Sequence, residues 1–339
     1  MDQQTITALC GMDESARKLI ALYCGKLLSE QDLADWFAEI KFEALKPEVS
    51  GMAAAIAVAQ DYNGAPPELV PRLRGIMRYV HTLNSGMAAG LCALSKRYNE
   101  AGIPVVLLGG TAVHLGYSEP PRRHIWQMEI GVSESDFSQA VKLASDEGFT
   151  VQKTAYNAIA RSGNTQCVVI RKGVGLTQEI SSLTANGVLF QIPDRSELLV
   201  CIAETVFLSL FGAAPGAKLM PQIADLHRVI AEEPDWERTA AIAKGRNTAG
   251  HVRLVLDLYY SLAATAPGTN VLDLFSTEDT PERLVQLLPK YRKLKPGSSK
   301  LKRLWISTQI KTGAPQSVAL KVFLKDLSAA VARKLTPKS

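Results

Sequence analysis

The sequence has few cysteines and few aromatic residues, and it lacks any long uninterrupted hydrophobic run. Its five cysteines are scattered and show no CxxC spacing, so a cysteine-based metal or redox motif is not indicated. Buried free thiols in a reducing cytoplasm are the simplest interpretation. The first residues also lack the basic region and apolar run of a signal peptide, which favours a cytoplasmic location.

The most apolar stretch, residues 198–214, carries Glu204 near its middle and is short for a membrane span. We therefore expect a buried helix there and no association with a membrane. Two catalytic patterns are also missing: the Gly-x-Ser-x-Gly element of serine hydrolases and the Walker A phosphate-binding loop. The sequence thus gives no indication of either chemistry.

The composition that remains is typical of a globular chain, with 47% hydrophobic and 21% charged residues in a length of 339. The net charge of +5 hides a strong asymmetry. Residues 281–339 contain 14 Lys and Arg but only two acids, Glu282 and Asp326, which gives this segment +12. The first 280 residues therefore carry a net charge of −7, so an acidic body precedes a basic tail.

The order of hydrophobic patterns predicts an α+β fold. Apolar residues at helical spacing fill residues 1–100, including a long amphipathic helix over 68–99 that ends at Ala101-Gly102. Short apolar runs then predict a small α/β core with a mixed sheet at 101–192. Residues 193–339 are helical again, with a last helix over 317–334, and contain the basic tail. We therefore expect three regions: an N-terminal helical region, a sheet core and a C-terminal helical region.

Within the core, strands are expected where short apolar runs lie between turn residues. A helix of about 14 residues should follow Ser133, whose pairing with Asp136 resembles a capping box. Ser162-Gly163-Asn164 is expected to form a hairpin turn. The predicted strands are 103–108, 125–132, 149–152, 166–171, 176–182 and 188–191.

One combination in the core points to chemistry. The strand that ends at Leu108 is followed by Gly109-Gly110 and a short helix, an arrangement that lets backbone N–H groups approach phosphate. On the next strand Gln127 and Glu129 alternate, so both side chains should lie on one face. A third acid on a neighbouring strand would complete a two-metal site, and Glu179 is the candidate.

These residues resemble the Gly-Gly and Asp-x-Asp pattern of the nucleotidyltransferase superfamily. More narrowly, residues 15–265 resemble the uncharacterised bacterial nucleotidyltransferase family. The resemblance implies that an NTP binds with Mg²⁺ and that a nucleotidyl group passes to a small-molecule, peptide or protein acceptor. The implied phosphate-binding residues are Gly109, Gly110, Thr111, Arg122 and Arg123, and the implied catalytic residues are Gln127, Glu129 and Glu179, of which Glu129 and Glu179 hold the metal.

The sequence departs from the family pattern where the metal should bind. Gln127 replaces the first Asp, Glu129 replaces the second with a longer side chain, and Ser181 stands where a His often follows the third acid. Since Mg²⁺ requires well-placed anionic oxygens, the carboxylate set is incomplete and its metal affinity should be reduced. The alternative is a catalytically inactive protein that keeps the fold and binds a partner.

Other assignments stay open at this stage. Gly109-Gly110 is also compatible with a plain tight turn, and Arg122 and Arg123 with a solvated basic turn. His114 is more typical of a packing or surface histidine than of a catalytic base. The basic residues around Tyr291 and Trp305 suit a polyanion or an acidic partner, although a solvated surface or docking onto the acidic body would also explain them.

The polyanion hypothesis gives a first prediction. Because 59 residues carry +12, removing the residues after Lys290 should lower the salt concentration at which the protein elutes from heparin. Elution on a salt gradient measures the effect. Unchanged retention of a soluble truncated protein would contradict the hypothesis.

Overall fold

The computed structural model describes residues 9–25, 29–117, 123–153, 157–163, 166–173, 180–210, 216–265, 268 and 270–276. Arg122, Glu179 and the whole basic tail lie outside these residues. The chain forms two compact units. Among the described residues, the sheet unit lies within 14–202 and 217–235, and the helical unit within 9–13, 203–210, 216 and 236–276.

Helices open the sheet unit, as the sequence predicts, and local signals explain where they begin and end. Ser29 and Asp32 form a reciprocal capping box at the start of α3, and a proline lies in the first turn of both α4 and α5. Helix α5 ends at Ala101, followed by Gly102 at φ +72°, which confirms the predicted C-cap. The elements are α2 (Glu14–Cys24), α3 (Glu30–Glu39), η1 (Phe42–Ala44), α4 (Pro47–Ala59) and α5 (Val70–Glu100).

The core of this unit is a seven-stranded mixed sheet in the order β3-β4-β5-β2-β1-β7-β6. Strand β2 lies antiparallel to β1 and parallel to β5, and β1 is parallel to β7; the other pairs are antiparallel. The predicted α+β class, a mixed sheet flanked by helices, is therefore confirmed. The strands are β1 (Val106–Leu107), β2 (Met128–Val132), β3 (Thr150–Lys153), β4 (Asn157–Ser162), β5 (Gln166–Lys172), β6 (Ile180–Ala185) and β7 (Val188–Pro193).

The sheet unit differs from the sequence prediction in several details, and β1 and β2 are shorter than the strands expected over 103–108 and 125–132. Strand β4 was not predicted, although the turn after it was, and Gly163 adopts φ +58° at that position. The strand expected over 176–182 overlaps β6, which extends to Ala185, and residues 176–179 lie outside the described residues. Helix α7 (Phe137–Asp146) begins later and is shorter than expected, because Ser133 bonds to Asp136 in a turn before the helix rather than at its N-cap.

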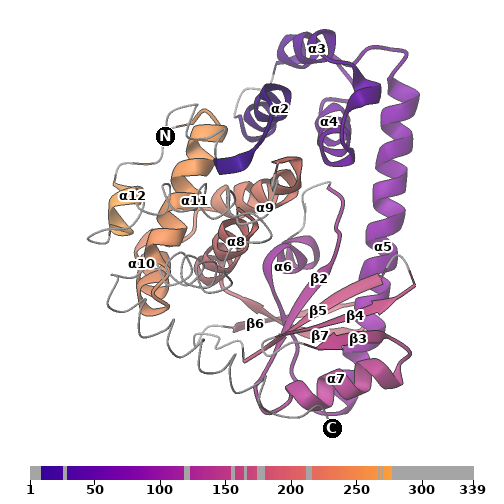
Figure 1. Cartoon of the computed structure of the whole chain (residues 1–339), viewed down its shortest axis with the longest axis vertical. Coiled ribbons are helices and arrows are strands. Elements are labelled where there is room, and N and C mark those ends of the chain that lie inside the picture. The colour runs from indigo at the N-terminus through magenta and orange to yellow at the C-terminus, as the bar shows by residue number, and fades with distance from the viewer. Residues whose placement is uncertain are drawn as a thin grey trace, which may run out of the picture. The chain divides into compact units, whose positions relative to one another are not determined.

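Buried side chains connect the helices to the sheet. All five residues of β2 are buried, so this strand forms the middle of the core. Tyr98 of α5 is fully buried and donates a hydrogen bond to the Ala140 carbonyl of α7 at 3.0 Å. In Figure 1, α5 extends from the first helices to the strands, and it contacts α4, α7 and β7. Helix α6 (Gly109–Gly116) contacts β2 and α9 (Met220–Ile230).

The remaining helices follow the sheet. Helix α8 (Arg195–Ser209) begins in the sheet unit and ends in the helical unit, and η2 (Gly216–Leu219) precedes α9. The apolar stretch at 198–214 contributes buried residues such as Leu199 and Phe207 to α8, as predicted. In the helical unit the Phe207 and His251 rings stack at 4.0 Å. The other elements of this unit are α10 (Trp236–Gly245), α11 (Ala249–Leu262) and α12 (Val271–Leu274).

The structure also describes the state of the cysteines and the length of the apolar helices. All five cysteines are free; three are buried and two are partly buried. Within the residues that the structure describes, no helix combines the length and apolarity needed to cross a bilayer.

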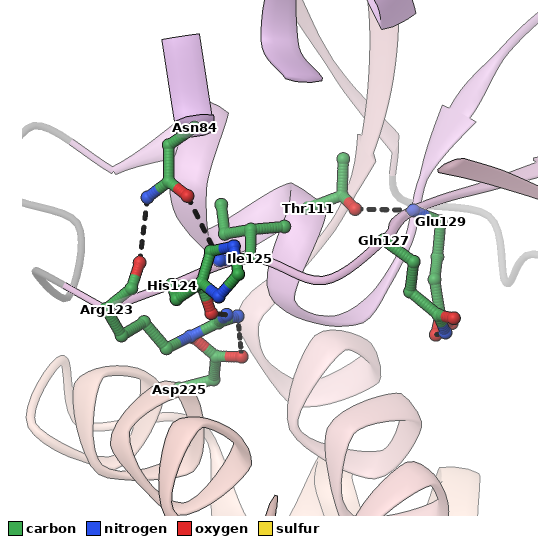
Figure 2. Close-up of polar contacts among 8 residues, drawn as sticks. All are labelled: Asn84, Thr111, Arg123, His124, Ile125, Gln127, Glu129 and Asp225. Carbon is green, nitrogen blue, oxygen red and sulfur yellow. Dashed lines mark hydrogen bonds and ion pairs between the residues drawn. The ribbon is translucent and has the colours of Figure 1, made fainter. Parts of the chain in front are cut away.

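The segment before β2 is fixed to α5 by one buried amide. Asn84, only 6% exposed, donates to the Arg123 carbonyl at 2.7 Å and accepts from the Ile125 N–H at 3.0 Å. Figure 2 shows this double contact. Because both backbone groups depend on the same side chain, Asn84 determines where the chain enters the site.

Replacing this amide should therefore destabilise the sheet unit. We expect Asn84→Ala to lower the free energy of unfolding by about 2–4 kcal/mol, since two buried backbone groups lose their partner. Urea unfolding followed by circular dichroism measures the loss. Thr82→Ala on the exposed side of the same helix is the control and should change stability by less than about 0.5 kcal/mol. Equal stability of the two variants would contradict this role.

Candidate functional site

The predicted site lies where β1 passes into α6 beside β2. The Leu108 N–H donates to the Glu129 carbonyl at 3.0 Å, and the Thr111 hydroxyl accepts from the Glu129 N–H at 2.6 Å. Gly109 adopts φ +49°, a left-handed conformation that side chains disfavour, and it opens the helix. The predicted strand, Gly-Gly turn and short helix are thus confirmed, with Glu129 packed against the turn.

Both oxygens of the Glu129 carboxylate accept hydrogen bonds from neighbouring side chains. Oε1 accepts from the Gln127 amide at 2.7 Å, so Gln127 and Glu129 share one face of the strand, as predicted. Figure 2 shows the ends of these two side chains together. Oε2 accepts from Nε of Arg171 at 3.1 Å and from its terminal nitrogen at 2.7 Å. Glu129 is 8% exposed, so this ion pair is largely shielded from water on the carboxylate side.

Arg171 is a site residue that the sequence analysis missed. It lies on β5, which pairs in parallel with β2 so that Arg171 stands opposite Gly131, two residues beyond Glu129. A lone arginine near the end of an apolar strand carries no local signal of such a partner. Only the pairing of β2 with β5 brings the guanidinium to the carboxylate.

A second ion pair covers the glycine turn. Arg123 binds the Asp225 carboxylate through two nitrogens, one of them Nε at 2.7 Å from Oδ1. Asp225 comes from α9 and is 3% exposed. Burial raises the pKa of the Asp225 carboxyl, and the Arg123 guanidinium opposes that shift. A Cβ atom added at Gly110 would clash with the ends of both side chains, so the pair packs directly on the glycine.

Burial lowers the pKa of the histidines near the site. Burial lowers the pKa of His114 to about 4, with smaller contributions from Arg123 and His81. Its Nδ1 is buried and has no hydrogen-bond partner among the described residues. Burial also lowers the pKa of His124, whose ring lies 4.0 Å from that of Trp126. His227 packs edge-on against Tyr23.

The described residues do not fit the magnesium site that the resemblance implies. They contain no group of three His, Cys, Asp or Glu side chains suited to a metal ion. The Glu129 oxygens already accept from Arg171 and Gln127, and Asp225 is bound to Arg123. Glu179, the predicted third ligand, lies outside the described residues.

The packing of the ion pair on Gly110 gives a prediction. Gly110→Ala should displace Arg123 and Asp225 and lower the free energy of unfolding by roughly 2–4 kcal/mol, because a buried ion pair is weakened. Gly75→Ala, at an exposed position of α5 with open space around it, is the control. It should be neutral or stabilise by up to about 1 kcal/mol. Thermal or urea unfolding separates the two outcomes, and equal effects would contradict the packing argument.

Comparisons with known proteins give one family match for the segment that contains this site. No curated protein matches the sequence. A solved structure, of an antigenic nucleotidyltransferase-like protein from Paracoccidioides brasiliensis, is similar at 13% identity over 55% of this chain and 95% of that one. Its TM-score of 0.33 supports no inference about this protein. Residues 44–174 match the model of a family described as uncharacterised nucleotidyltransferase. The predicted resemblance to the uncharacterised nucleotidyltransferase family is thus confirmed over the segment that holds the Gly109-Gly110 turn, β2 and Arg171.

Proposed function

We propose that this protein is a nucleotidyltransferase-like binding protein without metal-dependent transfer activity. The observation that carries the proposal is the internal pairing of Glu129 with Arg171 and Gln127. In the pattern that the sequence resembles, this carboxylate would bind a divalent cation. Here a guanidinium and an amide bind the same oxygens.

The charges explain why this pairing opposes metal binding. Glu129 and Arg171 sum to zero, and Gln127 adds no charge, so the described groups offer a divalent cation no net attraction. An incoming Mg²⁺ would have to displace Arg171 from a carboxylate that is largely shielded from water. Mg²⁺ also loses its own water reluctantly, and a single freed carboxylate compensates poorly for that loss.

Residues expected to bind phosphate also already have partners within the protein. Arg123 would have to leave the buried Asp225 before it could hold a triphosphate, which would strand an unpaired carboxylate. The same ion pair covers Gly110, one of the two glycines expected to contact phosphate. Gly109 lies beside the Glu129 carboxylate, whose charge Arg171 neutralises, so this side of the turn offers a phosphate no net attraction. The charges around the Gly109-Gly110 turn therefore favour a protein that binds its partner at another part of the fold.

One feature favours the second candidate, an active nucleotidyltransferase that binds NTP with Mg²⁺ and modifies an unknown acceptor. The Gly109 turn opens a helix whose N-terminus faces the site, and helix N-termini attract phosphate. Family membership of the matched segment is compatible with both candidates. Direct titration distinguishes them.

The proposal predicts how metal binding responds to the residues around Glu129. Wild type should show no Mg²⁺-dependent binding of any of the four common NTPs in calorimetry. Gln127→Asp alone should gain little, because Arg171 can neutralise the new carboxylate. Gln127→Asp with Arg171→Ala leaves two unpaired acids, and Mn²⁺ affinity should rise at least about tenfold over wild type.

The matched control is Gln127→Asp with Arg161→Ala, which removes an exposed arginine from β4 instead. It should behave like the single variant. Mn²⁺ binding is measured by electron paramagnetic resonance, and folding by circular dichroism. Mg²⁺-dependent NTP binding by wild type, or transfer of labelled nucleotide from it, would refute the proposal and support the active enzyme.

A further inference from the structure

A pocket of about 550 Å³ lies in the sheet unit, apart from the Glu129 carboxylate and its partners. Its wall is formed by the end of α4 and the residues after it, by one side of α5, and by His114 of α6. This volume is in the range of sites that bind small organic molecules. None of the assignments made for the Gly109-Gly110 turn uses this space.

The charged side chains among the described residues that line the pocket are of one sign. Arg74 and Arg78 contribute to its wall together with the imidazole rings of His81 and His114, and the described lining residues include no Asp or Glu. Neither Arg74 nor Arg78 forms an ion pair with a carboxylate in the part of the chain that the structure describes. Two arginines without an acidic partner beside a pocket produce a positive potential in an otherwise acidic body.

The rest of the wall is mainly apolar and aromatic, with Asn84 and Ser85 as further polar residues. The Arg74 guanidinium lies over the Tyr62 ring, 4.9 Å from its centre, which positions the charge beside an apolar surface. Met77 adds a flexible side chain on the α5 side. A ligand that matches this wall has an anionic group and an apolar or aromatic body.

His114 adds a polar ring to the same wall, because it is among the residues that line the pocket. Its Nδ1 atom is buried and has no hydrogen-bond partner among the described residues. The two arginines and the His114 ring thus line the same space.

We propose that this pocket is a binding site for a small organic anion, a phosphate or carboxylate group attached to an apolar body. The anionic group binds Arg74 and Arg78, and the body packs against Tyr62 and Met77. This inference goes beyond the proposed loss of transfer chemistry and does not depend on it, because neither Glu129 nor Arg171 is among the residues that line the pocket. Asn84 also lines the pocket, so a bound ligand would contact the residue that fixes the Arg123 segment.

The probe for the experiment is 8-anilinonaphthalene-1-sulfonate, which combines an anionic group with an aromatic body and fluoresces in apolar surroundings. The full-length protein should bind it with a stoichiometry near one. N-phenyl-1-naphthylamine, which lacks the sulfonate, should bind at least about tenfold more weakly, the size expected for a lost charge-assisted hydrogen bond. Phenyl phosphate and octanoate then compete with the probe, and the stronger competitor identifies the anionic group.

Variants connect the binding to the named residues. Arg74→Gln and Arg78→Gln should each weaken probe binding about tenfold, and His114→Phe should weaken it severalfold while keeping a ring in place. Lys96→Gln removes the same charge from an exposed position of α5 outside the pocket and should leave affinity unchanged. Circular dichroism confirms that each variant is folded.

Three results would overturn the proposal. The first is equal affinity for the charged and uncharged probes, which would make the site a general apolar surface. The second is equal affinity of the arginine variants and the Lys96 control, which would place the bound probe elsewhere. If none of the three anions binds wild type, the pocket is not an anion site.

Discussion

A carboxylate buried in a sheet either pairs with a positive charge or becomes protonated, and Glu129 pairs with Arg171. This one pair determines much of the character of the site. It holds β5 beside β2 through side chains as well as backbone. It also directs the carboxylate towards the protein instead of towards a bound cation. Gln127 completes the arrangement because its amide can donate where an aspartate could only repel.

A second set of polar contacts fixes the chain on the other side of the turn. Asn84 positions the backbone at Arg123 and Ile125, and Arg123 reaches Asp225 on α9. Gly110 provides the space in which this pair fits. These residues come from four places in the sequence, so the site depends on the packing of α5 and α9 as much as on the Gly-Gly motif itself.

The sequence predicted the parts of the fold that have local causes. Apolar periodicity and Gly102 indicated α5 and its end, and the Gly109-Gly110 motif indicated the start of α6. The alternation of Gln127 and Glu129 correctly indicated a shared face. The sequence did not predict features that depend on contacts between residues far apart in the chain. The parallel pairing of β2 with β5 brings Arg171 to Glu129, and no spacing rule shows that pairing in advance. Strand β4 (Asn157–Ser162) was not predicted because its sequence mixes small, apolar and polar residues.

The coupling of positions 127 and 171 also has an evolutionary consequence. An acid at position 127 would share Arg171 with Glu129, so this substitution alone would restore little metal affinity. Selection for metal binding would therefore not retain it. Loss of Arg171 alone would leave Glu129 with an uncompensated charge at a cost in stability. The two positions should therefore change together or not at all along a lineage. Relatives with an aspartate at the first position should lack a basic residue at the second, and intermediates should be rare.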